Sequence, residues 1–232
     1  MRKVLIWSFS ILFGIIIILF LVIKLLSEPI PKSIGDTKEA EALTDRLLTA
    51  INYPAYDSLA LIEWSFPRGH HFVWEKKINR VTVEWDEIKK VIFFPNTLEG
   101  EAYVDGKLVG EEGLKDEMIQ KAWALFANDS FWLVAPFKVR DPGTVRSIVQ
   151  TDEGVGLLVT YLSGGVTPGD SYLWILDEQY RPMAWKMWVK IIPIGGLKFM
   201  WESGQYYKDI WFAPSHSGPG GYKVDLVIHQ IQ

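Results

Sequence analysis

The four histidines are the side chains best suited to hold a metal ion or to transfer protons. Only His70 and His71 are close in sequence, and neighbouring residues of a strand point to opposite faces, so the pair cannot hold one ion together. His216 lies in a segment rich in Gly, Pro and Ser, and His229 lies near the C-terminus. Zinc sites need three or four converging ligands, and the chain has no cysteine. We therefore expect no metal site and no cofactor.

The usual motifs of nucleophilic and phosphate chemistry are missing from the sequence. There is no Gly-x-Ser-x-Gly motif, and Ser215-His-Ser-Gly-Pro219 has the composition of a turn. The glycine pairs at 164–165, 195–196 and 220–221 fall between expected strands, where hairpin turns explain them. A Ser/His/Asp triad assembled from distant positions stays open. We expect a protein that is not an enzyme.

Tryptophan is the unusual feature of the composition, with 11 residues in 232, and it recurs on nearly every expected strand. One interpretation is a large core of close-packed rings. The other is a cavity whose walls are wide, rigid aromatic rings and which holds an apolar ligand. The candidate ligand-binding residues are Trp64, Trp74, Trp85, Trp123, Phe131, Trp132, Phe137 and Trp185.

Residues 121–143 are the densest apolar part of the chain outside its N-terminus. We expect the end of a helix, a polar corner at Asn128-Asp129 and a short apolar segment that ends at Pro136. A turn at Asp141-Pro-Gly143 should follow. Strand-like stretches lie on both sides of this segment, so we predict that it plugs a sheet, with 131–137 as a lid over the cavity.

Residues 4–23 form a run of 20 uncharged residues that only Ser8, Ser10 and Gly14 interrupt. This length matches the ~20 residues that a helix needs to cross ~30 Å of hydrocarbon. A cleaved signal peptide stays open, although its apolar part usually has about 7–15 residues and ends at an Ala-x-Ala-like site, which is not found after Lys24. We predict an uncleaved transmembrane anchor at 1–26.

The charge distribution predicts the orientation of the chain in its membrane. Arg2 and Lys3 precede the apolar run, so the positive-inside rule places the N-terminus in the cytoplasm. We expect a single-pass inner-membrane protein whose domain lies in the periplasm or otherwise outside the cytoplasm. Beyond residue 26 the chain has 21 basic and 28 acidic residues, a net charge of −7. That balance argues against nucleic acid or an anionic membrane surface as the main partner.

Residues 27–35 should be a linker, and 36–232 a single domain of the α+β class that is mainly β. Asp36 and Glu39 have the spacing of a capping box, so a helix should begin there and end at Tyr53-Pro54. A second helix is expected at 115–127. Alternating apolar residues predict an antiparallel meander, with strands at 59–66, 70–77, 79–85, 88–94, 144–150, 155–162, 171–177, 183–190, 197–203, 206–212 and 222–231. Residues 102–109 should form a hairpin that turns at Asp105-Gly106.

The order of these elements, and the segment Asn128-Asp-Ser-Phe-Trp-Leu-Val-Ala-Pro-Phe-Lys138 followed by Asp141-Pro-Gly143, resembles the lipoprotein-carrier (Lol-type) superfamily of bacterial envelopes. The resemblance is greatest to an uncharacterised branch with an Asn-Asp-x-x-Trp-Leu-x-x-Pro-x-Lys motif. It implies a strongly curved antiparallel sheet, or half-open β-barrel, with helices on its concave side and an apolar cavity for lipid or lipoprotein acyl chains.

That resemblance supplies no catalytic residues, and this chain departs from carriers that travel between membranes because it is expected to be tethered. We therefore predict local binding of a lipid or acyl chain. The alternative is an interaction or scaffold module with a filled core and no ligand, which contacts other envelope proteins.

Overall fold

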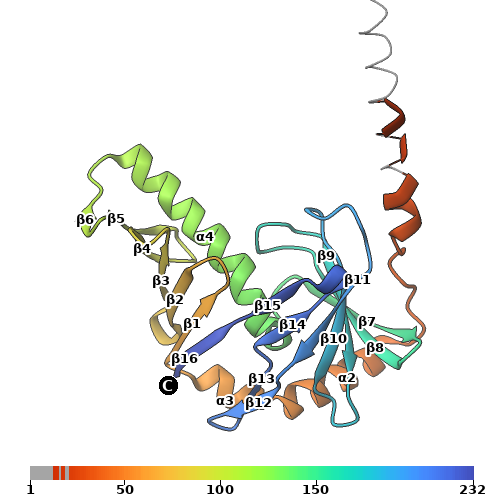
Figure 1. The fold of residues 1–232 in the computed structure, drawn as a ribbon. Coiled ribbons are helices and arrows are strands. Elements are labelled where there is room, and N and C mark those ends of the chain that lie inside the picture. The colour runs from red at the N-terminus through yellow and green to blue at the C-terminus, as the bar shows by residue number, and fades with distance from the viewer. Residues whose placement is uncertain (1–12, 16, 19–20) are drawn as a thin grey trace, which may run out of the picture.

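The computed structural model describes residues 13–15, 17–18 and 21–232 (Figure 1). Residues 21–26 are helical, and an extended segment over 27–34 follows them. No helix within the described residues is long and apolar enough to span a bilayer. Much of the predicted membrane segment at 4–23 lies outside the described residues, namely 4–12, 16 and 19–20.

Helix α2 (Thr37–Ala50) begins at the predicted capping box. Asp36 Oδ1 accepts a hydrogen bond from the backbone N–H of Glu39 at 2.9 Å, and Glu39 Oε2 accepts one from the N–H of Asp36 at 3.0 Å. The helix ends slightly earlier than predicted because Asn52 takes a left-handed conformation, with φ 57°. A short helix, α3 (Tyr53–Ser58), starts there, and Pro54 fits its first turn, where no backbone donor is needed.

Helix α4 (Glu112–Val134) is continuous, so the predicted corner at Asn128-Asp129 is wrong. The carboxylate of Asp129 is buried, at 2% exposure, and is 2.7 Å from His70 Nδ1. It also accepts a hydrogen bond from Asn128 Nδ2 at 2.9 Å. These tertiary partners satisfy a side chain that otherwise favours a turn. The 3₁₀ helix η2 (Ala135–Lys138) follows, and then the predicted turn, in which Gly143 has φ +81°.

Two seven-stranded antiparallel sheets form the body of the domain. The first has the order β16-β1-β2-β3-β4-β5-β6, and the second β15-β14-β11-β10-β9-β8-β7. The first sheet consists of β1 (Leu61–Phe66), β2 (His70–Glu75), β3 (Arg80–Trp85), β4 (Lys89–Phe94), β5 (Glu99–Val104), β6 (Lys107–Leu108) and β16 (Val227–Ile231), with η1 (Lys76–Ile78) between β2 and β3. The second consists of β7 (Thr144–Thr151), β8 (Gly154–Tyr161), β9 (Asp170–Leu176), β10 (Pro182–Trp188), β11 (Leu197–Glu202), β14 (Ser215–Ser217) and β15 (Lys223–Asp225), with η3 (Pro219–Gly221) before β15.

The last third of the chain departs from the predicted strands. The expected strand at 206–212 is a hairpin of β12 (Gln205–Tyr207) and β13 (Ile210–Phe212), because Lys208 and Asp209 have positive φ and form its turn. The expected strand at 222–231 divides into β15 and β16 at the buried Leu226. Each half pairs with a different neighbour, so two sheets joined by the chain at this residue replace the single curved sheet of the prediction.

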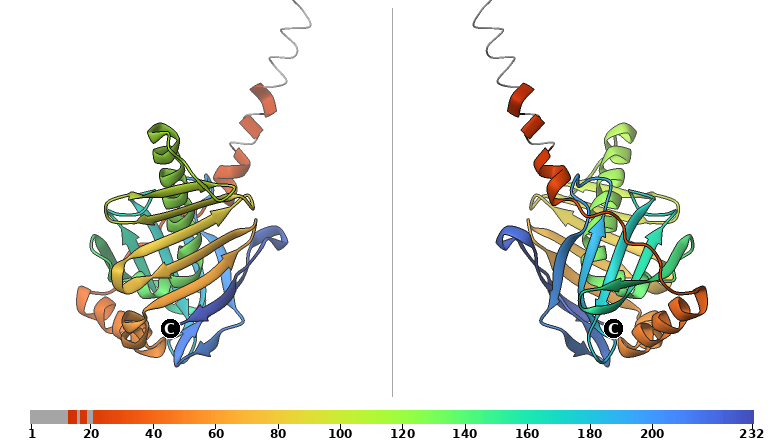
Figure 2. Two further views of the ribbon diagram at one scale, coloured as in Figure 1. Left: turned by 90° about the vertical axis from the view of Figure 1, so that its left-hand side faces the viewer. Right: turned by 90° about the vertical axis from the view of Figure 1, so that its right-hand side faces the viewer.

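Helix α4 lies between the two sheets (Figures 1 and 2). A continuous core of buried apolar side chains packs around it and runs from Ala40 to Ile231. Its largest fully buried side chains include Trp64, Trp174 and Trp185. Fully burying one large apolar side chain stabilises a fold by roughly 1.5–3 kcal/mol. The domain is therefore α+β and mainly β, as predicted, and its packing is organised around α4.

Candidate ligand-binding cavity

A cavity of about 450 Å³, partly open to solvent, lies beside the second half of α4. The apolar spacing of the helix explains which side chains reach it. Trp123, Ala127 and Phe131 follow one another at intervals of four residues and therefore share one face of the helix. All three line the cavity. The opposite wall comes from β8, β9 and β10 and from the loops that follow β8 and β10.

Five of the eight predicted residues line this cavity: Trp74, Trp123, Phe131, Trp132 and Trp185. The other three lie in the packed core. Trp64 is fully buried and stacks on Phe72 with ring centroids 4.9 Å apart. Trp85 is 3% exposed, and Phe137 stacks on Tyr56 of α3 at 3.9 Å. Residues 131–137 therefore do not form a separate lid, because they belong to the end of α4 and to η2.

Phe131 is the centre of an aromatic group on the cavity wall. Its ring centroid is 5.3 Å from that of Tyr161, 4.8 Å from that of Tyr172 and 5.9 Å from that of Trp185. Burial raises the pKa of both tyrosines, so their side chains stay uncharged at neutral pH. The hydroxyl of Tyr161 and the indole N–H of Trp185 are buried and have no hydrogen-bond partner in the part of the chain that the structure describes. This part of the wall is thus uncharged.

The charged residues on the cavity wall are paired. Lys138 Nζ lies 2.5 Å from Asp141 Oδ2. Asp170 accepts hydrogen bonds from Thr167 Oγ1 at 2.5 Å and from the backbone N–H of Lys190 at 3.0 Å. The two hydrogen bonds of Asp170 hold the loop after β8 against the start of the loop after β10. Because each charge has a partner from the protein, the cavity offers mainly aromatic and aliphatic surface to a ligand.

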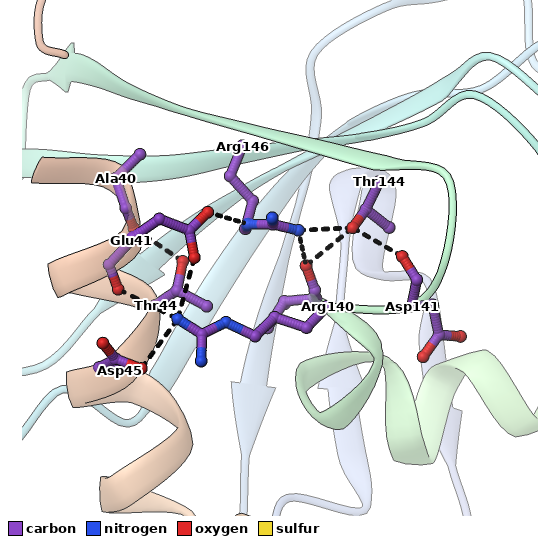
Figure 3. Close-up of polar contacts among 9 residues, drawn as sticks. Ala40, Glu41, Thr44, Asp45, Arg140, Asp141, Thr144 and Arg146 are labelled. Atoms are coloured by element: carbon purple, nitrogen blue, oxygen red, sulfur yellow. Dashed lines mark hydrogen bonds and ion pairs between the residues drawn. The ribbon is translucent and has the colours of Figure 1, made fainter. Parts of the chain in front are cut away.

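A charged network fixes the turn between η2 and β7, which carries Asp141 (Figure 3). Glu41 of α2 accepts hydrogen bonds from Arg146 Nε at 2.7 Å and from Arg140 Nη2 at 2.9 Å. Arg146 also donates to the carbonyl oxygen of Val139 at 3.0 Å. The hydrogen bond from Arg146 is the main cause of a lowered pKa at Glu41, and the charges of both arginines add to the effect. This network ties α2 to the rim of the cavity.

A second polar group, on the outer side of β1, was not anticipated from the sequence. Ser65 Oγ lies 3.1 Å from His71 Nδ1 and 2.8 Å from His229 Nε2, and His71 Nε2 lies 3.2 Å from Glu63 Oε1. Serine, histidine and glutamate in series have the connectivity of a hydrolytic triad.

The surroundings of this group favour a structural role. Ser65 is paired on both sides, with His71 of β2 and Val227 of β16, so the local backbone donors are used by the sheet and not available to an oxyanion. The group also lies outside the aromatic cavity. We interpret it as a cross-strand polar contact that joins β2, β1 and β16. In the described part of the chain, no three His, Asp or Glu side chains are grouped so as to hold a metal ion.

Some residues of the cavity wall could not have been identified from the sequence. Tyr161, Tyr172 and the loop residues 163–167 line the cavity but stand in stretches that looked like ordinary strand ends and turns. The alternation of apolar residues indicates which side chains of a strand point inward. It does not indicate which of them border a cavity beside α4, a helix that is distant in sequence.

No protein-family model matches the sequence, and no curated protein sequence is significantly similar to it. Among solved structures, the chain is similar to the crystal structure of a DUF1329 family protein from Desulfovibrio piger ATCC 29098. The match has a TM-score of 0.42 and 11% sequence identity, and it covers 83% of this chain and 92% of that chain. A similarity of this size supports no inference about function.

Proposed function

We propose that this protein is a membrane-anchored domain of the cell envelope that binds a lipid or acyl chain in its aromatic cavity and catalyses no reaction. The observation that carries the proposal is the cavity itself. The domain already has a continuous core around α4, yet Trp123, Phe131 and Trp185 also border a space of about 450 Å³ that protein atoms leave unfilled.

The size of the cavity suits one long aliphatic chain. Ligand pockets usually measure ~300–1,000 Å³. An apolar protein cavity of about 150 Å³ accommodates benzene, which has six carbon atoms. By that comparison, a cavity of about 450 Å³ has room for an apolar chain of roughly 18 carbons. A single acyl chain fits this estimate.

The chemistry of the wall also favours an apolar ligand. Moving aliphatic surface from water into such a site is favourable by roughly 25 cal/mol per Å². Rigid rings keep the space open, because Phe131 packs on three other aromatic side chains and is held on a continuous helix. Asp141 and Asp170 have partners from the protein and do not demand a charged ligand.

The anchoring, location and family position belong to the same proposal. The uncharged run at 4–23 would cross the inner membrane, and the domain would lie outside the cytoplasm. We place the chain in the uncharacterised Lol-type branch on the strength of its motif at 128–143, with a half-open barrel built from the two joined sheets around α4. The resemblance supports the proposal because that superfamily binds acyl chains.

A photoactivatable fatty acid tests the proposal with the full chain in membranes. After irradiation, we expect adducts on peptides that contain Phe131 or Trp185. The Ala127→Trp variant should lose them, because Ala127 borders the cavity and a larger side chain would fill it. Ala124→Trp is the matched control, since Ala124 is exposed on the same helix and does not line the cavity.

Adducts that are equally strong in wild type and Ala127→Trp would contradict binding in this cavity. A complete lack of adducts, together with a specific protein that co-purifies with the chain, would favour the alternative function of an envelope interaction or scaffold module.

A further inference from the structure

The two loops at the mouth of the cavity lie at the same end of the strands of the second sheet. Strands β8 and β10 both pair antiparallel with β9 and therefore run in the same direction. The loop that follows β8, at 162–169, contributes Val166 to the cavity wall, and the loop that follows β10, at 189–196, contributes Ile191 and Ile192. The mouth is thus bordered by two adjacent loop tips.

These loop tips present large apolar side chains to solvent. The exposed fraction is 59% for Leu162, 48% for Val166 and 67% for Ile191. Single exposed apolar residues are ordinary on protein surfaces, but several grouped around the entrance of an apolar cavity are typical of a surface that contacts a partner or a membrane.

The N-terminal segment is fixed to one of these loops. The backbone N–H of Glu28 donates to the carbonyl oxygen of Gly195 at 2.9 Å, and its carbonyl oxygen accepts from Trp188 Nε1 at 2.7 Å. The carboxylate of Glu28 contacts Lys186 Nζ at 2.7 Å, and the N–H of Gly195 donates to Ser27 Oγ at 2.9 Å. A side chain at Gly195 would collide with the Trp188 ring and with the carbonyl oxygen of Glu28, so the two segments fit closely.

This attachment sets the distance between the cavity mouth and the apolar N-terminal run. That run ends at Ile23, five residues before Glu28, and residues 21–26 are helical. The three helical steps to residue 26 rise about 1.5 Å each, and the two non-helical steps to Glu28 cover at most about 3.6 Å each, so the two points are no more than about 12 Å apart along the chain. Figures 1 and 2 show that the N-terminal helical residues extend from the domain on the side of these loops.

From this arrangement we infer that the mouth of the cavity lies on the surface of the lipid bilayer that holds residues 4–23, with the side chains of Leu162, Val166 and Ile191 inserted among the lipids. The inference rests on the proposed membrane anchoring and extends the proposed function, because a ligand would then pass between bilayer and cavity without crossing water. The net charge of −7 beyond residue 26 indicates that apolar insertion, and not attraction to anionic lipids, makes the contact.

Depth-dependent fluorescence quenching tests the contact with the full chain in phosphatidylcholine vesicles. Because the chain has no native cysteine, Val166→Cys and Ile191→Cys can each carry one environment-sensitive fluorophore. Glu178→Cys is the control, since Glu178 is exposed in the turn between β9 and β10, at the opposite end of these strands. We expect blue-shifted emission and strong quenching by lipids with a shallow nitroxide at positions 166 and 191, and neither effect at 178.

The outcomes separate this inference from the proposed function. If the probes at 166 and 191 behave like the probe at 178, membrane contact of the mouth is overturned, while fatty-acid adducts in the cavity would still support ligand binding. Quenching that persists in the Ala127→Trp background, where the cavity is filled, supports the contact independently of any ligand. A full chain that does not float with the vesicles would overturn the inference together with the membrane anchoring.

Discussion

Acidification should destabilise the domain through His216, which lies on β14 and is only 1% exposed. Its ring packs against the rings of Trp201 and Trp132, with centroids 4.5 and 5.3 Å away. Among the described residues, neither ring nitrogen has a partner for a well-formed hydrogen bond. Burial lowers the pKa of His216 from 6.5 to about 4, and the nearby backbone of Trp132 and Met200 offsets only part of this shift.

The sign of the effect follows from proton binding. Between pH 6.5 and about pH 4 the unfolded chain binds a proton at His216 and the folded chain does not. The free energy of unfolding is therefore unaffected by His216 above pH 6.5 and decreases as the pH falls from 6.5 toward 4. A shift of this size corresponds to about 3 kcal/mol over the whole range, at 1.36 kcal/mol per pH unit. Between pH 7 and pH 5 the loss should be about 2 kcal/mol.

Urea unfolding of the full chain in nonionic detergent micelles measures this loss through tryptophan fluorescence at pH 7 and pH 5. Other groups also titrate, so the decisive quantity is the difference from a variant that cannot be protonated. His216→Phe and His216→Leu should each lose about 2 kcal/mol less than wild type over this interval, whatever their stability at pH 7. Equal losses in wild type and both variants would refute the assignment of acid sensitivity to His216.

Two further predictions concern particular contacts. Replacing Glu41 with Gln removes the charge that pairs with Arg146 and should lower the free energy of unfolding by about 1 kcal/mol. Asp45 is exposed, and Asp45→Asn should have almost no effect on the free energy of unfolding in urea. Equal effects of the two substitutions would contradict a role for the network in Figure 3. In Gly100→Ala the new Cβ would lie 2.2 Å from a backbone oxygen of β4, so we expect a loss of about 2 kcal/mol or more. Gly110→Ala, with open space around it, should leave the thermal midpoint within about 2 °C of wild type, and matching shifts in the two variants would refute the steric argument.

Features that depend on neighbouring residues could be predicted from the sequence. The start of α2 followed from Asp36 and Glu39, because a capping box uses only groups within one turn. The hairpin at Asp105-Gly106 and the alternation of β3 likewise reflect local conformational preference and a period of two. For the site, the density of aromatic side chains identified Trp123, Phe131 and Trp185 as wall residues, although the helix that carries Phe131 was expected to end at residue 127.

Features that depend on distant residues required the tertiary structure. Asn128-Asp129 looks like a corner until His70, 59 residues away, supplies a partner for the Asp129 carboxylate, and α4 then continues through it. The strand pattern over 222–231 is uninterrupted, yet it divides at Leu226 because its two halves find different neighbours. Trp64 and Trp185 are both inward-facing tryptophans, but only Trp185 borders the cavity. Local sequence sets the period and ends of an element, whereas the position of α4 between two sheets decides which of its neighbours are core and which are wall.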